Sequence, residues 1–404
     1  MNVVANDVDI AVPYGCTVHG DDEIAAVVGV LKSSTQMGKH VYDMERKVSD
    51  LFSKQFGIMV NSGSSANYLA VELLSLPAGT EVITPALTFA TTVAPLIKHH
   101  LIPVFIDVEE DTFNINASQI EEMITPNTKA MLIPNLIGNL PDWKLLRAIA
   151  NRHNLILIED SADTIGATIQ DLPVGHYTDI TTTSFYGSHV INCAGNGGML
   201  CVNDVRQANK AKLLRSWGRS SSLYIESEAI ENRFNTKIDG IAYDAKFMFE
   251  EIGYNLEPSE MGAAFGLVQL GKLEKNIGLR EKFFKHHLEF FRQYQEWLIL
   301  PRQLPDSRTG WLAFPMIVRD TAPFNRRELQ IYLERRRIQT RTIFTGNVLR
   351  QPGFCNIKRR ETKLGYPCAD QVMRGGILLG CHHGMTDSMM MHIHQSFERF
   401  IQSL

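Results

Sequence analysis

Short apolar runs alternate with amphipathic segments between residues 21 and 204. Apolar residues at helical spacing predict helices over 21–33, 43–56, 64–76, 90–99, 117–124 and 142–153. Runs rich in β-branched residues predict strands over 81–86, 102–108, 129–135, 155–160, 180–186 and 197–204. Because helices follow most of these strands, the pattern predicts a mostly parallel sheet that helices cover on both faces.

The pattern changes beyond Asn255. Residues 257–297 predict one long helix or two, broken near Gly271 or Gly278. A smaller mixed segment follows, with a strand over 311–318 and helices over 326–337 and 386–402. A chain of 404 residues exceeds the size that one core usually reaches. We therefore expect an N-terminal arm and a large cofactor-binding domain over 1–275, and a small C-terminal domain over 276–404.

Composition and charge favour an ordinary globular protein. Hydrophobic residues make up 44% of the chain, charged residues 21%, and the net charge is −4. This charge gives no reason to expect a nucleic acid or an anionic membrane as a partner. The sequence shows no signal peptide and no apolar run near the roughly 18 residues that span a bilayer. Six scattered cysteines suit reduced thiols. Together these features predict a cytoplasmic location.

Three polar motifs follow predicted strands, where open parallel sheets bind their ligands. In NSGSSAN, the residues Gly63, Ser64 and Ser65 would present N–H groups and hydroxyls to an anion at a helix N-terminus. A serine-rich helix cap is the simpler alternative. In LILIEDSADTIGA, Asp160 ends a buried strand. Its carboxylate can hold a pyridine nitrogen protonated, or it can cap the next turn.

The third motif, TTTSFYGSHVINCAGNGGMLCVND, spans residues 181–204 and joins two predicted strands. Ser184 offers a further hydroxyl for a phosphate, and the GNGG turn leads into the second strand. The chain has neither a P-loop nor a GxGxxG motif. The nucleoside triphosphate and Rossmann dinucleotide interpretations therefore lose their main support.

Together the three motifs resemble the sugar aminotransferase (DegT/StrS) superfamily of fold type I pyridoxal-phosphate (PLP) enzymes. The resemblance runs from about residue 20 to the C-terminus. It implies a three-layer αβα large domain, a smaller α/β C-terminal domain and a homodimer with shared active sites. The implied cofactor-binding residues are Gly63, Ser64, Ser65 and Ser184 for the phosphate, Phe89 stacked on the ring, Asp160 at the ring nitrogen, Asp163 near the 3-hydroxyl, and Asn255, which binds the phosphate across the dimer.

His189 stands where this superfamily has the lysine that binds the cofactor covalently. The nearest lysines in sequence, Lys144 and Lys210, belong to flanking helices. Histidine has no primary amine, but its ordinary pKa of about 6.5 lets it move protons near neutral pH. We therefore expect the cofactor to bind non-covalently, as pyridoxamine phosphate (PMP), with His189 as acid and base. An inactive or engineered aminotransferase is the alternative.

The segments NLIGNLPDW and FTGNVLRQPGF resemble one subgroup, the nucleotide-sugar 3-dehydrases, which also have this histidine. The CDP-4-keto-6-deoxyglucose type carries a [2Fe–2S] cluster on four cysteines and takes electrons from a reductase. The GDP-4-keto-6-deoxymannose type is the second relative. This chain has Ser161 and the run Ser220-Ser221-Ser222 in the segments that match the cluster cysteines. Serine does not replace a thiolate ligand, so we expect no iron–sulfur cluster and no metal site.

The resemblance thus implies removal of the 3-hydroxyl from a nucleotide-linked 4-keto-6-deoxyhexose, with an amino donor such as glutamate restoring PMP. His189 and Asp160 are the expected catalytic residues. A dehydrase that needs an external reductant, or another PMP reaction such as isomerisation, stays open. A further alternative is a non-catalytic protein that binds the cofactor or a nucleotide sugar. The expected substrate contacts are Trp217, Arg219, Asn347 and Arg350.

Overall fold

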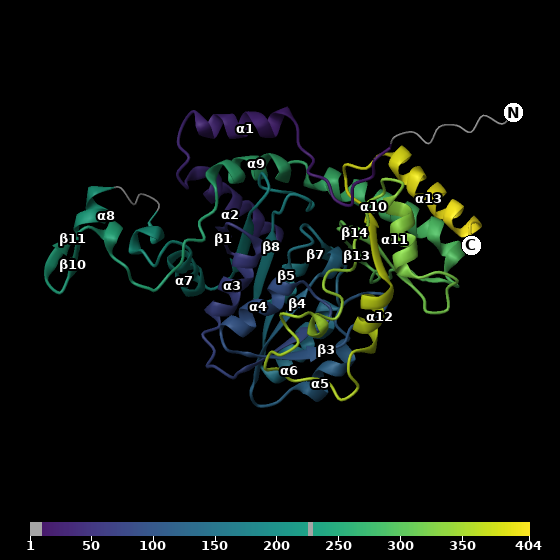
Figure 1. Ribbon diagram of the computed structural model, residues 1–404. Helices are drawn as coiled ribbons and strands as arrows, with labels where there is room; N and C mark the ends of the chain where they lie inside the picture. The colour runs from purple at the N-terminus through teal and green to yellow at the C-terminus, as the bar shows by residue number, and fades with distance from the viewer. Residues whose placement is uncertain (1–9, 225–228) are drawn as a thin grey trace.

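A seven-stranded sheet forms the centre of the protein in the computed structural model, which describes residues 10–224 and 229–404 (Figure 1). The strand order is β1-β9-β8-β5-β4-β2-β3. Strands β8, β5, β4, β2 and β3 run parallel, whereas β9 is antiparallel to β1 and β8. The carboxyl ends of the parallel strands therefore share one edge. The strands are β1 (Phe56–Val60), β2 (Glu81–Pro85), β3 (Ile102–Ile106), β4 (Thr128–Pro134), β5 (Ile156–Ser161), β8 (Ile180–Ser184) and β9 (Gly198–Val202).

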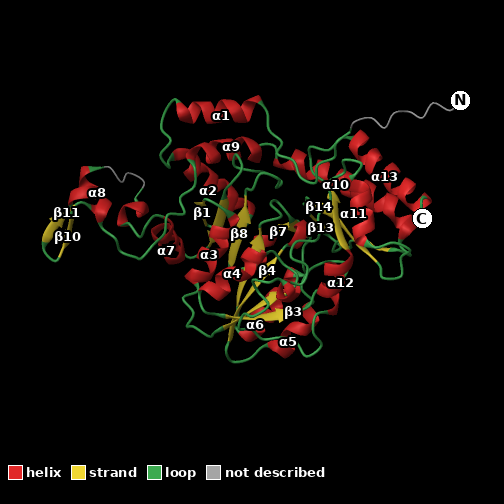
Figure 2. Ribbon diagram, in the orientation of Figure 1, coloured by secondary structure: helices red, strands yellow, loops and turns green. Residues whose placement is uncertain are grey.

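Helices cover both faces of this sheet (Figure 2). Alternate side chains of β1 divide between the layers: Ile58 and Val60 pack on one side, and Met59 on the other. The first layer holds α3 (Gly63–Leu73), α4 (Ala90–Lys98) and α7 (Val205–Arg215). The second holds α2 (Lys39–Leu51), α5 (Ile120–Met123) and α6 (Trp143–His153). This arrangement confirms the three-layer αβα fold. Within the described ranges, no helix is long and apolar enough to cross a membrane.

A smaller α/β unit follows. Its antiparallel sheet contains β12 (Leu298–Ile299), β14 (Ala313–Val318) and β15 (Gly376–Gly380). Its helices are α10 (Leu273–Phe291), α11 (Arg326–Glu334), α12 (Pro367–Gly375) and α13 (Asp387–Gln402). The helix expected over 257–297 is two helices, α9 (Glu260–Leu270) and α10, with the break at Gly271. The domain boundary near residue 275 stays a proposal.

Three further features lie outside the two main sheets. Helix α1 (Asp21–Leu31) lies on α9. Residues 217–224 and 229–253, which we call the arm, project to the left in Figure 1. The arm carries α8 (Ile230–Phe234) and a hairpin of β10 (Thr236–Ile238) and β11 (Ile241–Tyr243). A small sheet of β6 (Thr168–Ile169), β7 (Leu172–Pro173) and β13 (Ser307–Arg308) completes the strands.

The sequence pattern did not predict β1 as a strand. The helix expected over 43–56 is α2, which begins at Lys39 and ends at Leu51. Ser53 then takes a left-handed φ of 53°, which turns the chain into β1. The apolar run of β1 directly follows the apolar face of the helix, so periodicity alone merged the two elements.

A buried histidine pair should make the small unit sensitive to acid. His287 Nε2 donates to the Gly380 carbonyl at 3.1 Å, and its Nδ1 lies 3.0 Å from His394 Nε2. Burial, with a smaller contribution from His394, lowers the pKa of His287 to about 3, and burial lowers that of His394 to about 4. Unfolded histidine titrates near 6.5. The unfolded chain therefore binds protons first as the pH falls.

We expect His287 to contribute its full stability above pH 6.5, and the free energy of unfolding to fall below that pH. The loss attributable to His287 should reach about 2 kcal/mol at pH 5. Urea unfolding at pH 7 and pH 5 measures it. His287→Asn should reduce the difference between the two pH values, whereas exchange of the exposed His19 for glutamine should leave it unchanged. Equal pH dependence in all three proteins would contradict the assignment.

Candidate active site

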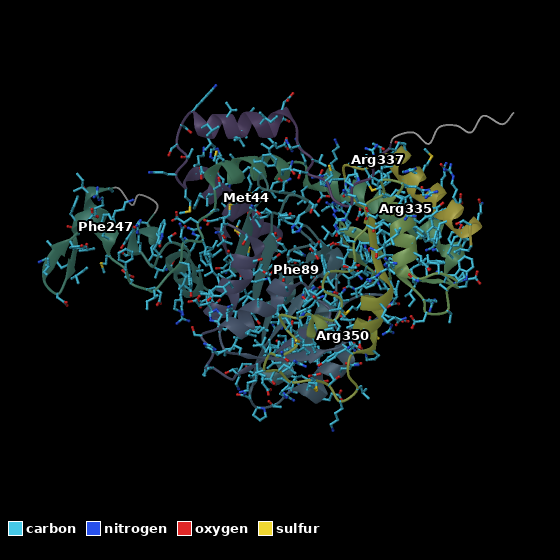
Figure 3. The ribbon with its side chains drawn as sticks, viewed as in Figure 1. Met44, Phe89, Phe247, Arg335, Arg337 and Arg350 are labelled. Atoms are coloured by element: carbon cyan, nitrogen blue, oxygen red, sulfur yellow. The ribbon has the colours of Figure 1, made fainter. Side chains whose placement is uncertain are left out.

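A cavity of about 380 Å³ opens where β4, β5 and β8 end. All three sequence motifs contribute to its wall, which confirms that they meet at the carboxyl edge of the sheet. The expected site residues that line it are Gly63, Ser64, Phe89, Asp160, Asp163, Ser184 and His189. Phe89 lies near the centre of Figure 3, and its ring packs edge-on against Phe344 with 5.8 Å between centroids.

The N-terminus of α3 forms a small polar cup against β8. Ser62 caps the helix, because its Oγ accepts from the Ser65 N–H at 3.1 Å. A Cβ added at Gly63 would lie 2.6 Å from the Ser184 Cβ, so only glycine lets Ser184 approach the helix so closely. N–H groups at a helix N-terminus, joined by serine hydroxyls, suit a phosphate. The Ser65 hydroxyl instead donates to Asn61 Oδ1 at 2.6 Å, and Ser65 does not line the cavity.

Asp160 is a buried carboxylate that only neutral groups hold. Its Oδ2 accepts from Asn67 Nδ2 at 2.8 Å and from Thr92 Oγ1 at 2.9 Å, and its Oδ1 accepts from the Ala162 N–H. Burial raises its pKa. Among the described residues, Asp160 makes no ion pair. A protonated pyridine nitrogen would supply the missing positive charge, so this donor set fits the ring of PLP or PMP.

His189 is held as a neutral base. Its Nδ1 lies 3.2 Å from the Ser184 carbonyl, which can only accept, so Nδ1 carries the proton and Nε2 presents a lone pair. Nε2 lies 4.0 Å from Asp163 Oδ1. Burial lowers the pKa of His189 to about 4, and the nearby Arg280 adds to the effect. The imidazole is therefore neutral at pH 7.

Asp163 is fixed by a strained turn. Its Oδ2 accepts from the Ile137 N–H at 2.9 Å. Ile137 has a φ of 61°, a conformation that costs energy for a β-branched residue. Gly138 follows with a φ of 84°. Burial raises the pKa of Asp163 to about 7, so this carboxyl can exchange a proton near neutral pH. The segment NLIGNL thus positions the group that faces His189.

Arg280 of α10 lies behind the cavity and was not found from the sequence. Its fully buried guanidinium donates to the carbonyls of Ser188, Trp311 and Leu312, each at 3.0 Å. It therefore fixes the backbone beside His189. Tyr14 of the N-terminal segment also lines the cavity and was also missed. In a single sequence, nothing marks an arginine on an amphipathic helix, or a tyrosine outside any motif, as a residue of the site.

The remaining expected residues do not line this cavity. Trp217 and Arg219 begin the arm, where the guanidinium stacks 4.4 Å from the indole centroid. Asn347 Nδ2 donates to Asp370 at 2.7 Å, and Arg350 forms an ion pair with the same carboxylate. Asn255 Oδ1 accepts from the Glu257 N–H at 3.4 Å. The roles assigned to these five residues stay predictions.

The model of the DegT/DnrJ/EryC1/StrS aminotransferase family matches residues 18–398. The lipopolysaccharide biosynthesis protein RfbH of Salmonella typhimurium is 35% identical over 88% of this chain and 84% of its own length. The dTDP-4-dehydro-2,6-dideoxy-D-glucose 3-dehydratase of Saccharopolyspora spinosa is 31% identical over 96% of this chain and 86% of its own length.

Solved structures agree with these sequence relatives. E. coli GDP-4-keto-6-deoxy-D-mannose-3-dehydratase with bound hydrated PLP is 26% identical, with a TM-score of 0.87 over 96% of this chain and 99% of that one. A second structure, of GDP-4-keto-6-deoxymannose-3-dehydratase with a trapped PLP-glutamate geminal diamine, has a TM-score of 0.85. It is 26% identical over 95% of this chain and 99% of that one.

The close approach of Gly63 to Ser184 yields a prediction. Gly63→Ala should displace Ser184 and weaken the binding of PLP and PMP by about tenfold or more. Absorbance titration of the apoprotein measures the Kd. Gly29→Ala is the matched control, because a Cβ there meets nothing within 4 Å. Unchanged cofactor affinity in Gly63→Ala, with the protein folded, would contradict the location of the phosphate.

Proposed function

The chain belongs to the DegT/DnrJ/EryC1/StrS aminotransferase family, and we propose that it is a PMP-dependent 3-dehydratase of a nucleotide-linked 4-keto-6-deoxyhexose. The observation that carries the proposal is His189, a neutral base with a free Nε2, at the position of the family's lysine. Among the described residues, no lysine lines the cavity. Relatives named as nucleotide-sugar 3-dehydratases support the assignment.

Different residues of the cavity would bind different parts of the cofactor. When bound, PMP supplies an amine that condenses with a ketone and a ring that accepts electrons. Gly63, Ser64 and Ser184 would bind its phosphate, Phe89 would lie against its ring, and Asp160 would keep the ring nitrogen protonated. Cofactor binding therefore needs no covalent bond to the chain.

His189 then moves one proton. Its Nε2 takes the proton from carbon, and the resulting imidazolium faces Asp163 at 4.0 Å, which stabilises the charge. The same proton passes to the departing 3-hydroxyl, so that water leaves. Arg280 holds the Ser188 carbonyl throughout, which keeps the imidazole in place. A lysine at this position would instead form a covalent bond with the aldehyde of PLP.

We further propose that the reaction needs no iron–sulfur cluster and no external reductase. The Ser161 hydroxyl donates to Glu159, and it accepts from Asn135 at 2.7 Å, inside a buried network. Among the described residues, no three His, Cys, Asp or Glu side chains lie together as a metal ion requires. Bound PMP would supply the two electrons, and the products would be PLP, ammonia and a 3-deoxy-4-keto sugar. Glutamate would restore PMP, which the glutamate-bound relative supports.

Product analysis tests the proposal. Purified protein, PMP and glutamate are incubated with 4-keto-6-deoxyhexoses linked to CDP, GDP or dTDP. No reductase is added, and the products are identified by mass spectrometry. We expect a 3-deoxy-4-keto sugar over many turnovers. His189→Asn should retain PMP binding and lose at least about 100-fold in kcat.

An aminosugar product would contradict the proposal, and full activity of His189→Asn would contradict the role of the base. A protein that fails to convert PLP and glutamate into PMP and 2-oxoglutarate would instead be the non-catalytic alternative. A product that forms only after a reductase is added would identify the reductant-dependent alternative.

We also propose that the arm joins two copies into a homodimer with shared active sites, and that Asn255 at its base serves the second copy. The arm extends away from the body, and Phe247 lies far from Phe89 in Figure 3. Arg219 stacks on Trp217 and lies within 6 Å of the Phe247 and Phe249 ring centroids. The exposed apolar side chains are Tyr224, Ile230, Phe234, Ile238, Ile241, Tyr243, Phe247, Phe249 and Ile252. So large an apolar surface favours a protein partner.

Phe247→Asp should weaken the dimer, because it places a charge in the apolar contact. Light scattering over a dilution series should show monomers at concentrations where the wild type is dimeric. Leu364→Asp is the control, since Leu364 is 79% exposed in a loop away from the arm. A Phe247→Asp protein as dimeric as the wild type would contradict the proposed contact.

A further inference from the structure

Tyr14 enters the cavity from a segment that the small unit fixes. Val12 is fully buried and bridges to Ile338, with its N–H donating to the Arg337 carbonyl at 2.9 Å. Its own carbonyl accepts from the Gln339 N–H at 2.9 Å. This short parallel bridge defines the path of the chain immediately before the tyrosine.

Two more contacts hold the next residues. The Tyr14 N–H donates to Gln339 Oε1 at 3.1 Å, and the Pro13 carbonyl accepts from His382 Nε2 at 3.1 Å. The peptide group between Pro13 and Tyr14 is therefore held at both its carbonyl and its N–H. Its side chain lines the cavity together with Asp163, His189 and Leu312.

The Tyr14 phenol is a donor without an acceptor. In the part of the chain that the structure describes, its hydroxyl forms no hydrogen bond. Burial and the charge of Asp163 raise its pKa, so the hydroxyl keeps its proton throughout the pH range of the enzyme. Tyr14 is half-buried and lines the cavity, so its hydroxyl can donate to an oxygen atom of a ligand bound there.

The environment indicates where that ligand atom lies. Asp163 and Arg280 both act electrostatically on the phenol, and Asp163 also faces His189 Nε2. Because Tyr14 lines the same cavity as Asp163 and His189, its side chain is available to a substrate held beside the base. Tyr186 also packs near His189, with 5.8 Å between ring centroids, but it is 57% exposed, which is more than Tyr14.

We propose that the Tyr14 hydroxyl donates a hydrogen bond to the 3-hydroxyl of the hexose as it departs, an inference that rests on the proposed function. The C3–O bond breaks and its electron pair leaves with the oxygen. The proton on His189 Nε2 joins that oxygen and water departs. Tyr14 keeps its own proton and stabilises the charge that builds on the oxygen.

Tyr14→Phe separates this role from a structural one. The half-reaction that converts PLP and glutamate into PMP and 2-oxoglutarate involves no departing hydroxyl, so its rate should stay within about twofold of the wild type. Dehydration of the sugar that the wild type consumes should fall about 100-fold in kcat. The Kd of the 3-deoxy product, measured by calorimetry, should not change, because that sugar lacks the hydroxyl. Tyr42→Phe on the exposed side of α2 is the control.

Equal losses in both half-reactions would overturn the inference, because Tyr14 would then act through the fold or through His189. Unchanged dehydration in Tyr14→Phe would also overturn it. A wild type that performs the glutamate half-reaction but dehydrates none of the sugars would refute the proposed function itself, which is a distinguishable result.

Discussion

The site depends on the hydrogen bonds that Arg280 donates to three backbone carbonyls. The guanidinium is fully buried and donates to Ser188, Trp311 and Leu312. It joins the loop after β8, the start of β14 and helix α10 around one charge. A buried cation without a paired carboxylate is costly. Burial keeps the adjacent imidazole neutral, with a smaller contribution from Arg280, and the bond from Arg280 to the Ser188 carbonyl fixes the backbone beside His189.

The same cavity gives two carboxylates different tasks. Asp160 accepts from neutral donors and forms no ion pair with any residue that the structure describes, an environment that would suit a protonated ring nitrogen. Asp163 is held by the Ile137 N–H and faces His189, with its pKa raised to about 7. Environment rather than residue type separates the two roles. The division is consistent with a cofactor bound by polar contacts and with proton transfer by the chain.

The sequence predicted the αβα layers because apolar periodicity decides which faces are buried. It predicted seven of the residues that line the cavity. Most of these belong to motifs at strand ends, which share one edge of a parallel sheet, whereas Phe89 and Asp163 came from the resemblance to the family. It missed β1, because the apolar run of this strand directly follows the apolar face of α2, and it did not predict α12 or β15. It also missed Arg280 and Tyr14, since long-range packing alone brings α10 and the N-terminal segment to the site. Asn347 and Arg350 carried a motif, yet their side chains bind Asp370.

The central claim is that this cavity holds its cofactor without a covalent bond, because a histidine replaces the lysine. The most direct measurement is the intact mass of the protein after one equivalent of PLP is added, excess is removed and borohydride reduces any covalent adduct. The account predicts the mass of the unmodified chain while PLP is recovered after denaturation. A phosphopyridoxyl group attached in full yield to one lysine would contradict it.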